Sequence, residues 1–267
     1  MVIRSRTDSV LTRRFDGTLA DRAPDELVVE EPLTIHLDDH VVSSTMRTPG
    51  HDFELAAGFL FAEAVLEPGW VTGIRYCGLG ATPESEFNVV SVETGGIAPA
   101  PTARLGSISS ACGMCGAEAI ETLTEQLEDL GPYQPWDLDL LVSLPDAMRA
   151  QQPLFDQTGA VHAAAAADRD GNLLHVREDI GRHNAVDKVT GRLLLDGQLP
   201  ATDLALVVSG RASFEMAQKA WAAGYTALVA VSAPSALAVT TAQRAGLTLV
   251  GFTRNGHATV YSPDTRG

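Results

Sequence analysis

The fold is decided by residues 204–253, LALVVSGRASFEMAQKAWAAGYTALVAVSAPSALAVTTAQRAGLTLVGFT, in which short apolar runs alternate with amphipathic segments. The apolar runs predict strands at 204–210, 227–232 and 247–253, and the segments between them predict helices at 213–224 and 234–246. A strand at 173–179 and a helix at 182–197 are expected just before this stretch. This alternation predicts an α/β fold whose mostly parallel sheet has helices on both faces.

Residues upstream of this unit predict a smaller part that is rich in strands. Runs at 26–37 and 41–48 are separated by a turn and predict a hairpin, and a helix follows with Asp52 as a candidate N-cap. Two more strands are expected at 69–79 and 87–93. The chain therefore begins with a β-rich part that carries one helix.

Three further helices are expected before the alternating unit that begins at residue 173. The first is amphipathic, with a buried stripe formed by Ala117, Ile120, Leu123, Leu127 and Leu130. The second begins at Ser143 and Pro145, and the third covers the alanine-rich run at 158–172. We divide the chain into an N-terminal arm (1–25) and a CxxC loop (107–116), both expected to be mobile, the β-rich part (26–106) and a three-layer α/β part that would bind the ligand (117–267).

Polar segments follow the predicted strands of the α/β part, at 177–179, 209–211, 232–235 and 252–257. Ligands of such sheets bind beyond the carboxyl ends of the strands, so these segments are expected to meet at the site. Ser209, Gly210 and Ser232 lead into helix N-termini that can hold phosphate oxygens, and Arg211 and Arg254 can add charge-assisted bonds. The serines are equally suited to simple helix capping. No GxGxxG or Walker sequence is present, so dinucleotide-dehydrogenase and P-loop functions are not supported.

Composition restricts the location and partners of the protein. The 267 residues include 19 basic and 34 acidic side chains, for a net charge of −15, which disfavours binding to nucleic acid. The first twenty residues hold no apolar signal segment, and no stretch approaches the ~18 apolar residues of a membrane span. We expect a cytoplasmic protein without membrane contact, whose 3 cysteines are reduced.

Two of the cysteines, Cys112 and Cys115, lie in the glycine-rich stretch SSACGMCG at 109–116. A zinc site would need four ligands, and only the isolated Cys77 and scattered histidines are available, so no metal is expected. A redox dithiol belongs at a strand-to-helix turn, whereas a Pro/Ala/Gly-containing link precedes Cys112. A mobile loop with thiolate character suits a sulfur carrier better, because a thiolate can take a sulfane sulfur and hold it as a persulfide.

Histidines supply two further candidates. Zinc deaminases carry an H-x-E pair, but Ala164 stands two residues after His162, so deaminase chemistry is not supported. His183 and Asp187 are four residues apart on one predicted helix and could pair, with Asp179 nearby. A structural polar network is the more common role of such residues.

Five stretches together resemble the formate dehydrogenase accessory sulfurtransferases of the FdhD family. They are TPGHDFELAAGFLFAE (48–63), SSACGMCG (109–116), REDIGRHNAVDKVTG (177–191), VVSGRASFEMAQKAW (207–221) and VSAPSALAV (231–239). The resemblance runs in order from about residue 26 to 262. One departure is Ala160, which stands where the second glycine of a TGG sequence is expected.

The resemblance implies a fold similar to cytidine deaminases without their zinc, and a specific function. The family carries sulfur from a cysteine desulfurase to the molybdenum or tungsten bis-pterin guanine dinucleotide cofactor of formate dehydrogenase, for which GDP or GMP would be a mimic. It implies that Cys112 forms the persulfide, with Cys115 as its partner. The implied cofactor-binding segment is Phe252, Thr253, Arg254, Asn255, Gly256 and His257.

The implied partners are the desulfurase, the catalytic subunit of formate dehydrogenase and a second copy of the chain in a homodimer. Two other functions stay open. The protein could be a chaperone that delivers the cofactor without obligatory sulfur transfer, or a dithiol oxidoreductase. The three functions differ in what the cysteines must do.

Overall fold

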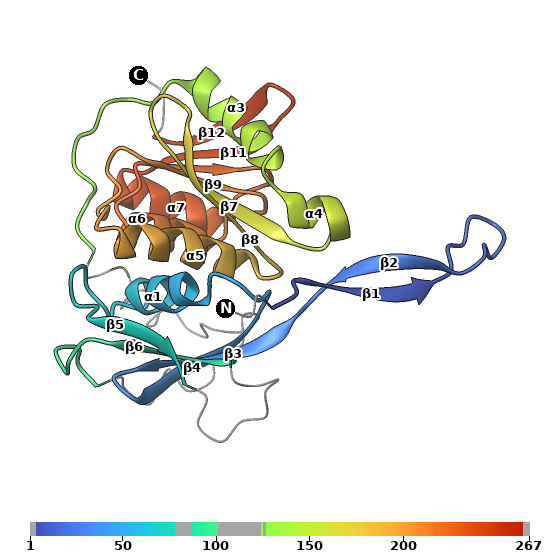
Figure 1. The fold of residues 1–267 in the computed structure, drawn as a ribbon. Helices are drawn as coiled ribbons and strands as arrows, with labels where there is room; N and C mark the ends of the chain where they lie inside the picture. The colour runs from blue at the N-terminus through green and yellow to red at the C-terminus, as the bar shows by residue number, and fades with distance from the viewer. Residues whose placement is uncertain (1–3, 78–86, 101–123, 125–126, 264–267) are drawn as a thin grey trace.

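The computed structural model describes residues 4–77, 87–100, 124 and 127–263 (Figure 1). Its strands are β1 (Thr7–Thr12), β2 (Ala23–Val28), β3 (Glu31–Leu37), β4 (His40–Arg47), β5 (Gly73–Tyr76), β6 (Val89–Glu93), β7 (His162–Ala167), β8 (Leu173–Asp179), β9 (Ala205–Val208), β10 (Ala227–Ala230), β11 (Thr248–Arg254) and β12 (His257–Ser262). Its helices are α1 (Asp52–Ala62), α3 (Leu138–Arg149), α4 (Pro153–Thr158), α5 (Arg182–Leu195), α6 (Phe214–Ala222) and α7 (Ala236–Ala245). The expected CxxC loop, Cys112 and Cys115 lie outside the described residues.

The larger sheet has the strand order β12-β11-β10-β9-β7-β8. β9, β10 and β11 are parallel, whereas β12, β7 and β8 are joined through antiparallel pairs. The predicted mostly parallel sheet is therefore correct only for the three central strands. Short turns link β7 to β8 and β11 to β12, and such turns can join only antiparallel strands. β8 still runs in the direction of β9, so the carboxyl ends of β8, β9, β10 and β11 share one edge.

The alanine-rich run at 158–172 contains strand β7 at His162–Ala167, so the predicted helix is wrong. Ala164 and Ala166 pack on the face that α5, α6 and α7 cover, and Ala163, Ala165 and Ala167 pack on the face that α3 covers. The strand lies between β8 and β9, and pairing with both neighbours outweighs the helix propensity of alanine. Helices therefore do cover both faces of the larger sheet (Figure 1).

The smaller part contains the sheet β4-β3-β6-β5 with α1 packed on it. α1 also packs against α5, and the two helices approach each other at Gly58 and Gly191. A Cβ at Gly58 would lie 1.9 Å from the carbonyl oxygen of Asp187, and one at Gly191 would lie 1.8 Å from that of Glu54. Only glycine permits this approach, which joins the two parts of the molecule.

Strands β1 and β2 form an antiparallel ribbon that projects from the body (Figure 1). The ribbon includes much of the arm expected at 1–25, and Leu11, Phe15 and Leu19 on it are exposed. At its base, Arg6 Nη2 donates a hydrogen bond of 3.2 Å to the carbonyl oxygen of Glu178 in β8. The base of the ribbon is thus attached to the larger sheet.

Several helix boundaries differ from the predictions. The N-cap of α1 is His51 and not Asp52, whose carboxylate is bound by Arg47 at 3.0 and 3.1 Å. α3 begins after Asp137, whose carboxylate accepts a bond from the Asp139 amide, so Ser143 and Pro145 lie inside this helix. Most of the helix predicted after Cys115 lies outside the described residues, but Leu127 and Leu130 pack against the main core.

The described residues contain no helix with the length and apolarity that crossing a membrane requires.

Candidate functional site

A cavity of about 520 Å³ opens at the carboxyl edge of the larger sheet and is called the edge cavity here. Its wall includes the ends of β9 and β11, the start of β7, and α3 with the segment that follows it. The lining residues that matter below are Arg149, His162, Ile180, Ser209, Thr253 and Arg254. The cavity is where the strand directions predict a ligand site, and its volume is in the ~300–1,000 Å³ range of small-molecule pockets.

The structure brings Ser209, Thr253 and Arg254 together at this cavity, as expected. Ser209 Oγ accepts a bond of 2.9 Å from the Ala163 amide and lies 3.4 Å from His162 Nδ1. Thr253 is fully buried, and its hydroxyl has no hydrogen-bond partner among the described residues. Since buried hydroxyls are normally paired, this one is suited to bind a polar group that is not part of the described chain.

The segment 252–257 forms the tight turn between β11 and β12. Asn255 and Gly256 have φ values of 52° and 73°, and Arg254 pairs with His257 across them, as in the two-residue turns that favour Asn-Gly. Phe252 is 44% exposed and has a φ of 52° next to a register shift. Phe252, Asn255, Gly256 and His257 do not line the edge cavity, so they stand at its border or outside it.

The other predicted edge residues lie side by side through backbone contacts. The Ser232 amide donates to the Gly210 carbonyl oxygen at 3.2 Å, and the Ser232 carbonyl oxygen accepts from the Phe252 amide at 3.2 Å. A Cβ at Gly210 would lie 3.6 Å from His162 Nδ1. Gly210, Ser232 and the exposed Arg211 do not line the edge cavity.

The two helix N-termini that were expected to hold phosphate, those of α6 and α7, differ in their capping. Ser235 accepts a bond of 3.1 Å from the Ala238 amide, and so it caps α7. Ser213 is the N-cap residue of α6 but makes no side-chain capping bond. Neither serine lines the edge cavity, so its polar groups come mainly from the strand ends and from α3.

Sequence reasoning missed two residues of the edge cavity. Arg149, at the end of α3, lies 2.6 Å from Asp156 and stacks 4.6 Å from the centre of the Phe155 ring. His162 belongs to no zinc-deaminase motif, but it lines the cavity at the start of β7. Burial and the charge of Arg182 lower the pKa of His162, so its ring is neutral at pH 7. No pattern in the sequence indicates that α3 reaches this edge.

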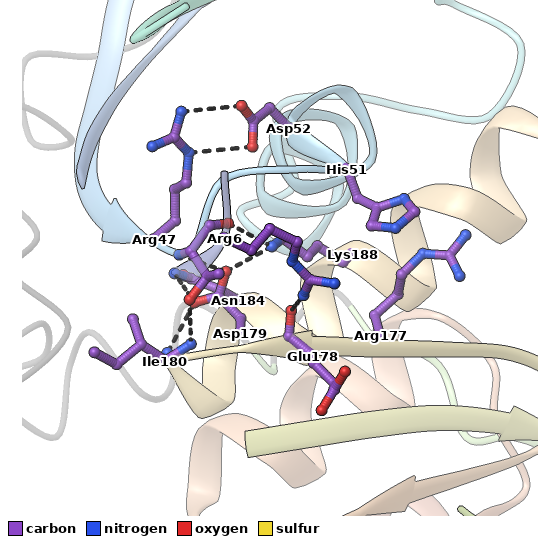
Figure 2. A network of polar contacts seen from close by, with 12 residues as sticks. Arg6, Arg47, His51, Asp52, Arg177, Glu178, Asp179, Ile180, Asn184 and Lys188 are labelled. Carbon is purple, nitrogen blue, oxygen red and sulfur yellow. Dashed lines mark hydrogen bonds and ion pairs between the residues drawn. The ribbon is translucent and has the colours of Figure 1, made fainter. Parts of the chain in front are cut away.

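A buried polar network holds the end of β8 against the smaller part (Figure 2). Lys188 Nζ lies 2.6 Å from Asp179 Oδ2 and donates to the Thr48 carbonyl oxygen at 3.0 Å, and both charged side chains are fully buried. Asp179 also accepts bonds from the Thr48 amide at 3.1 Å and the Asn184 side chain at 3.0 Å. The network orients the segment 178–184 that borders the cavity.

A second ion pair in this region involves Glu54 and Arg177, 2.6 Å apart. Burial alone would raise the pKa of Glu54, but hydrogen bonds from His51 and Arg177 outweigh it and lower this pKa to about 2. Glu54 is therefore a carboxylate at every pH at which the protein is normally studied.

His183 and Asp187 do not pair with each other, contrary to one expectation. His183 Nε2 lies 2.6 Å from Glu215 Oε2, and Asp187 binds Lys219 Nζ at 2.6 Å. Both partners come from α6, which packs beside α5 and offers stronger contacts than the i,i+4 spacing.

The fold and site define an α/β protein with a partly polar cavity at the carboxyl edge of a mixed sheet. Residues 28–267 match the FdhD/NarQ family, and the chain belongs to that family. A sulfur carrier protein FdhD from Streptomyces avermitilis is 49% identical over 260 residues, covering 94% of this chain and 92% of that one. One from Mycobacterium tuberculosis is 43% identical over 265 residues, covering 96% and 92% of the two chains.

A solved structure has the same fold. It is the crystal structure of a protein from Desulfotalea psychrophila described as a formate dehydrogenase accessory protein, with a TM-score of 0.78 and 25% identity. The match covers 98% of this chain and 99% of that one.

Proposed function

We propose that this protein is a sulfurtransferase that takes sulfane sulfur from a cysteine desulfurase. It delivers this sulfur to the molybdenum or tungsten bis-pterin guanine dinucleotide cofactor of formate dehydrogenase. The observation that carries the proposal is the identity of 43–49% to sulfur carrier proteins FdhD over more than nine-tenths of the chain. We place the protein in the cytoplasm as a homodimer that meets the desulfurase and the catalytic subunit of formate dehydrogenase.

The edge cavity would hold a guanine dinucleotide end of the cargo. Arg254 and Arg149 would bind phosphate oxygens, and the unpartnered Thr253 hydroxyl and Ser209 would donate or accept hydrogen bonds. The exposed turn that carries Asn255, Gly256 and His257 would close over the nucleotide from outside. A strongly acidic protein needs such local cations to hold an anionic ligand.

Cys112 would supply the sulfur chemistry. Its thiolate attacks the terminal sulfur of the desulfurase persulfide, a new S–S bond forms on Cys112, and the desulfurase thiolate leaves. Cys115, three residues away, would stabilise or relay the persulfide. Both cysteines lie outside the described residues, so this role rests on the sequence and the family.

We expect Cys112→Ala to abolish sulfur loading. After incubation with desulfurase and cysteine, the wild-type chain should gain a sulfur of roughly 32 Da on the peptide containing Cys112, as persulfide formation requires. Mass spectrometry of the digested protein checks this result. Cys77→Ala is the matched control and should keep the adduct. A Cys112→Ala chain that still yields active formate dehydrogenase would contradict the proposal and favour a delivery chaperone.

We expect Arg254→Ala to weaken GDP binding about tenfold, the effect of losing one charge-assisted hydrogen bond. GDP and GMP act here as mimics of the nucleotide end, and calorimetric titration measures the affinity. Arg13→Ala, a change at an exposed residue directly after β1 that does not line the edge cavity, should leave the affinity unchanged. Equal GDP affinity of wild type and Arg254→Ala would show that the nucleotide does not bind beside Arg254 in the edge cavity.

A further inference from the structure

A second cavity, of about 240 Å³, adjoins the edge cavity and is called the side cavity here. His162 and Ile180 line both cavities, so these two side chains form a shared wall. The remaining lining residues are Glu30, Met46, Gly181, Arg182 and His183. The side cavity is smaller than the ~300 Å³ at which typical small-molecule pockets begin, so it suits a small group and not a nucleotide.

The side cavity is lined by one carboxylate, that of Glu30, and by the guanidinium of Arg182. The Nε of Arg182 is buried and has no hydrogen-bond partner, and within the described part of the chain no carboxylate forms an ion pair with it. The nearby Arg177 and Arg192 differ, because they pair with Glu54 and Asp196. Arg182 as a whole is partly exposed, but a buried N–H donor without a partner costs free energy, so its Nε at the cavity favours an acceptor such as an anion.

Other groups at the side cavity also favour an anion. Gly181 is the N-cap of α5, a helix of 14 residues, and it offers no capping side chain, so the positive end of the helix dipole faces this region. His162 provides a ring nitrogen on the shared wall. Of the acidic groups nearby, Glu30 is exposed, Glu215 lies 2.6 Å from His183, and Asp179 is bound by Lys188.

We propose that the side cavity binds a small sulfur anion, the terminal sulfane sulfur of a persulfide, next to the cargo in the edge cavity. The inference rests on the proposed function and assigns the site that holds the sulfur before its transfer to the cargo. Arginine suits such an anion, because its guanidinium is weakly hydrated and presents several donors. The shared wall puts this anion one side chain away from the nucleotide-bearing cavity.

Thiosulfate is the probe, and inorganic phosphate is the comparison, because a phosphate of the cargo could use the same cations. We expect thiosulfate to bind the full chain, and to bind still when GDP is present at saturation. Arg182→Gln should weaken thiosulfate about tenfold, the loss of one charge-assisted bond, without changing GDP affinity. His162→Gln is a second variant and should weaken thiosulfate too. Arg192→Gln, an exposed change on the same helix, should have no effect.

Four outcomes would overturn the inference: no thiosulfate binding to the wild type, equal binding to Arg182→Gln, tighter binding of phosphate than of thiosulfate, or displacement of thiosulfate by GDP together with weaker GDP binding to Arg182→Gln. Either of the last two outcomes assigns Arg182 to a phosphate of the cargo. Failure of the proposed function looks different. If Cys112 gains no sulfur although thiosulfate binds as described, the sulfurtransferase proposal fails and the side cavity remains an anion site.

Discussion

Replacement of Lys188 by methionine should lower the free energy of unfolding by about 3–5 kcal/mol, the range for breaking a buried ion pair. Lys188 and Asp179 are both fully buried and lie 2.6 Å apart. Methionine fills a similar volume, so the loss comes from the charge: Asp179 would keep its bonds from Thr48 and Asn184 but lose its only cation among the described residues. Urea titration followed by circular dichroism measures the change.

Arg192→Met is the matched control for this prediction. Arg192 lies on the same helix and pairs with Asp196 at 2.7 Å, but its side chain is 43% exposed. Exposed pairs contribute about 0–1 kcal/mol, so this variant should unfold close to the wild type. If Lys188→Met lost no more stability than Arg192→Met, the network at the end of β8 would not hold the two parts together.

Gly191→Ala should produce the second large effect, a loss of about 3 kcal/mol or failure to fold. The new Cβ would lie 1.8 Å from the carbonyl oxygen of Glu54, so α1 and α5 must move apart. Alanine normally stabilises a helix by up to ~1 kcal/mol relative to glycine, so a net loss isolates the cost of the collision. The midpoint of thermal unfolding and the yield of folded protein report the result.

Gly73→Ala serves as the control, because Gly73 has a φ in the ordinary range and its nearest neighbour would be the Glu93 carboxylate at 3.5 Å. This variant should stay within about 0.5 kcal/mol of the wild type, as most surface substitutions do. If Gly191→Ala folded in normal yield with an unchanged midpoint of thermal unfolding, α1 and α5 would not be in the contact described above.

The sequence predicts the α/β part best where local patterns are strong. The strands and helices from residue 204 onward are found near their expected positions, because apolar alternation and glycine-marked ends persist there. The helix predicted for the alanine-rich run at 158–172 was wrong for the opposite reason. The composition of this run favours a helix, and only pairing with the neighbouring strands β8 and β9 makes it a strand. Strand β12 was not expected, although Asn255 and Gly256 are a typical hairpin signal.

The candidate site was predictable only in part. The rule that ligands bind at the carboxyl ends of strands led to Ser209, Thr253 and Arg254. The same rule could not find Arg149 or Arg182, because they lie at opposite ends of helices whose placement depends on tertiary packing. Membership of the FdhD/NarQ family confirms the resemblance, whereas the roles of Cys112 and Cys115 remain predictions to be measured.

The alanines of β7 let helices pack close to both faces of the sheet, so β7 has no space for larger side chains. A larger side chain at Ala164 or Ala166, on the face that α5, α6 and α7 cover, must displace α5, whose first turn carries Arg182 and His183. A larger side chain on the other face must displace α3, whose last turn carries Arg149. A larger side chain in β7 would therefore shift α5 or α3. Such a shift would move Arg182 and His183 or Arg149, so ligand affinity would change before the protein lost its fold.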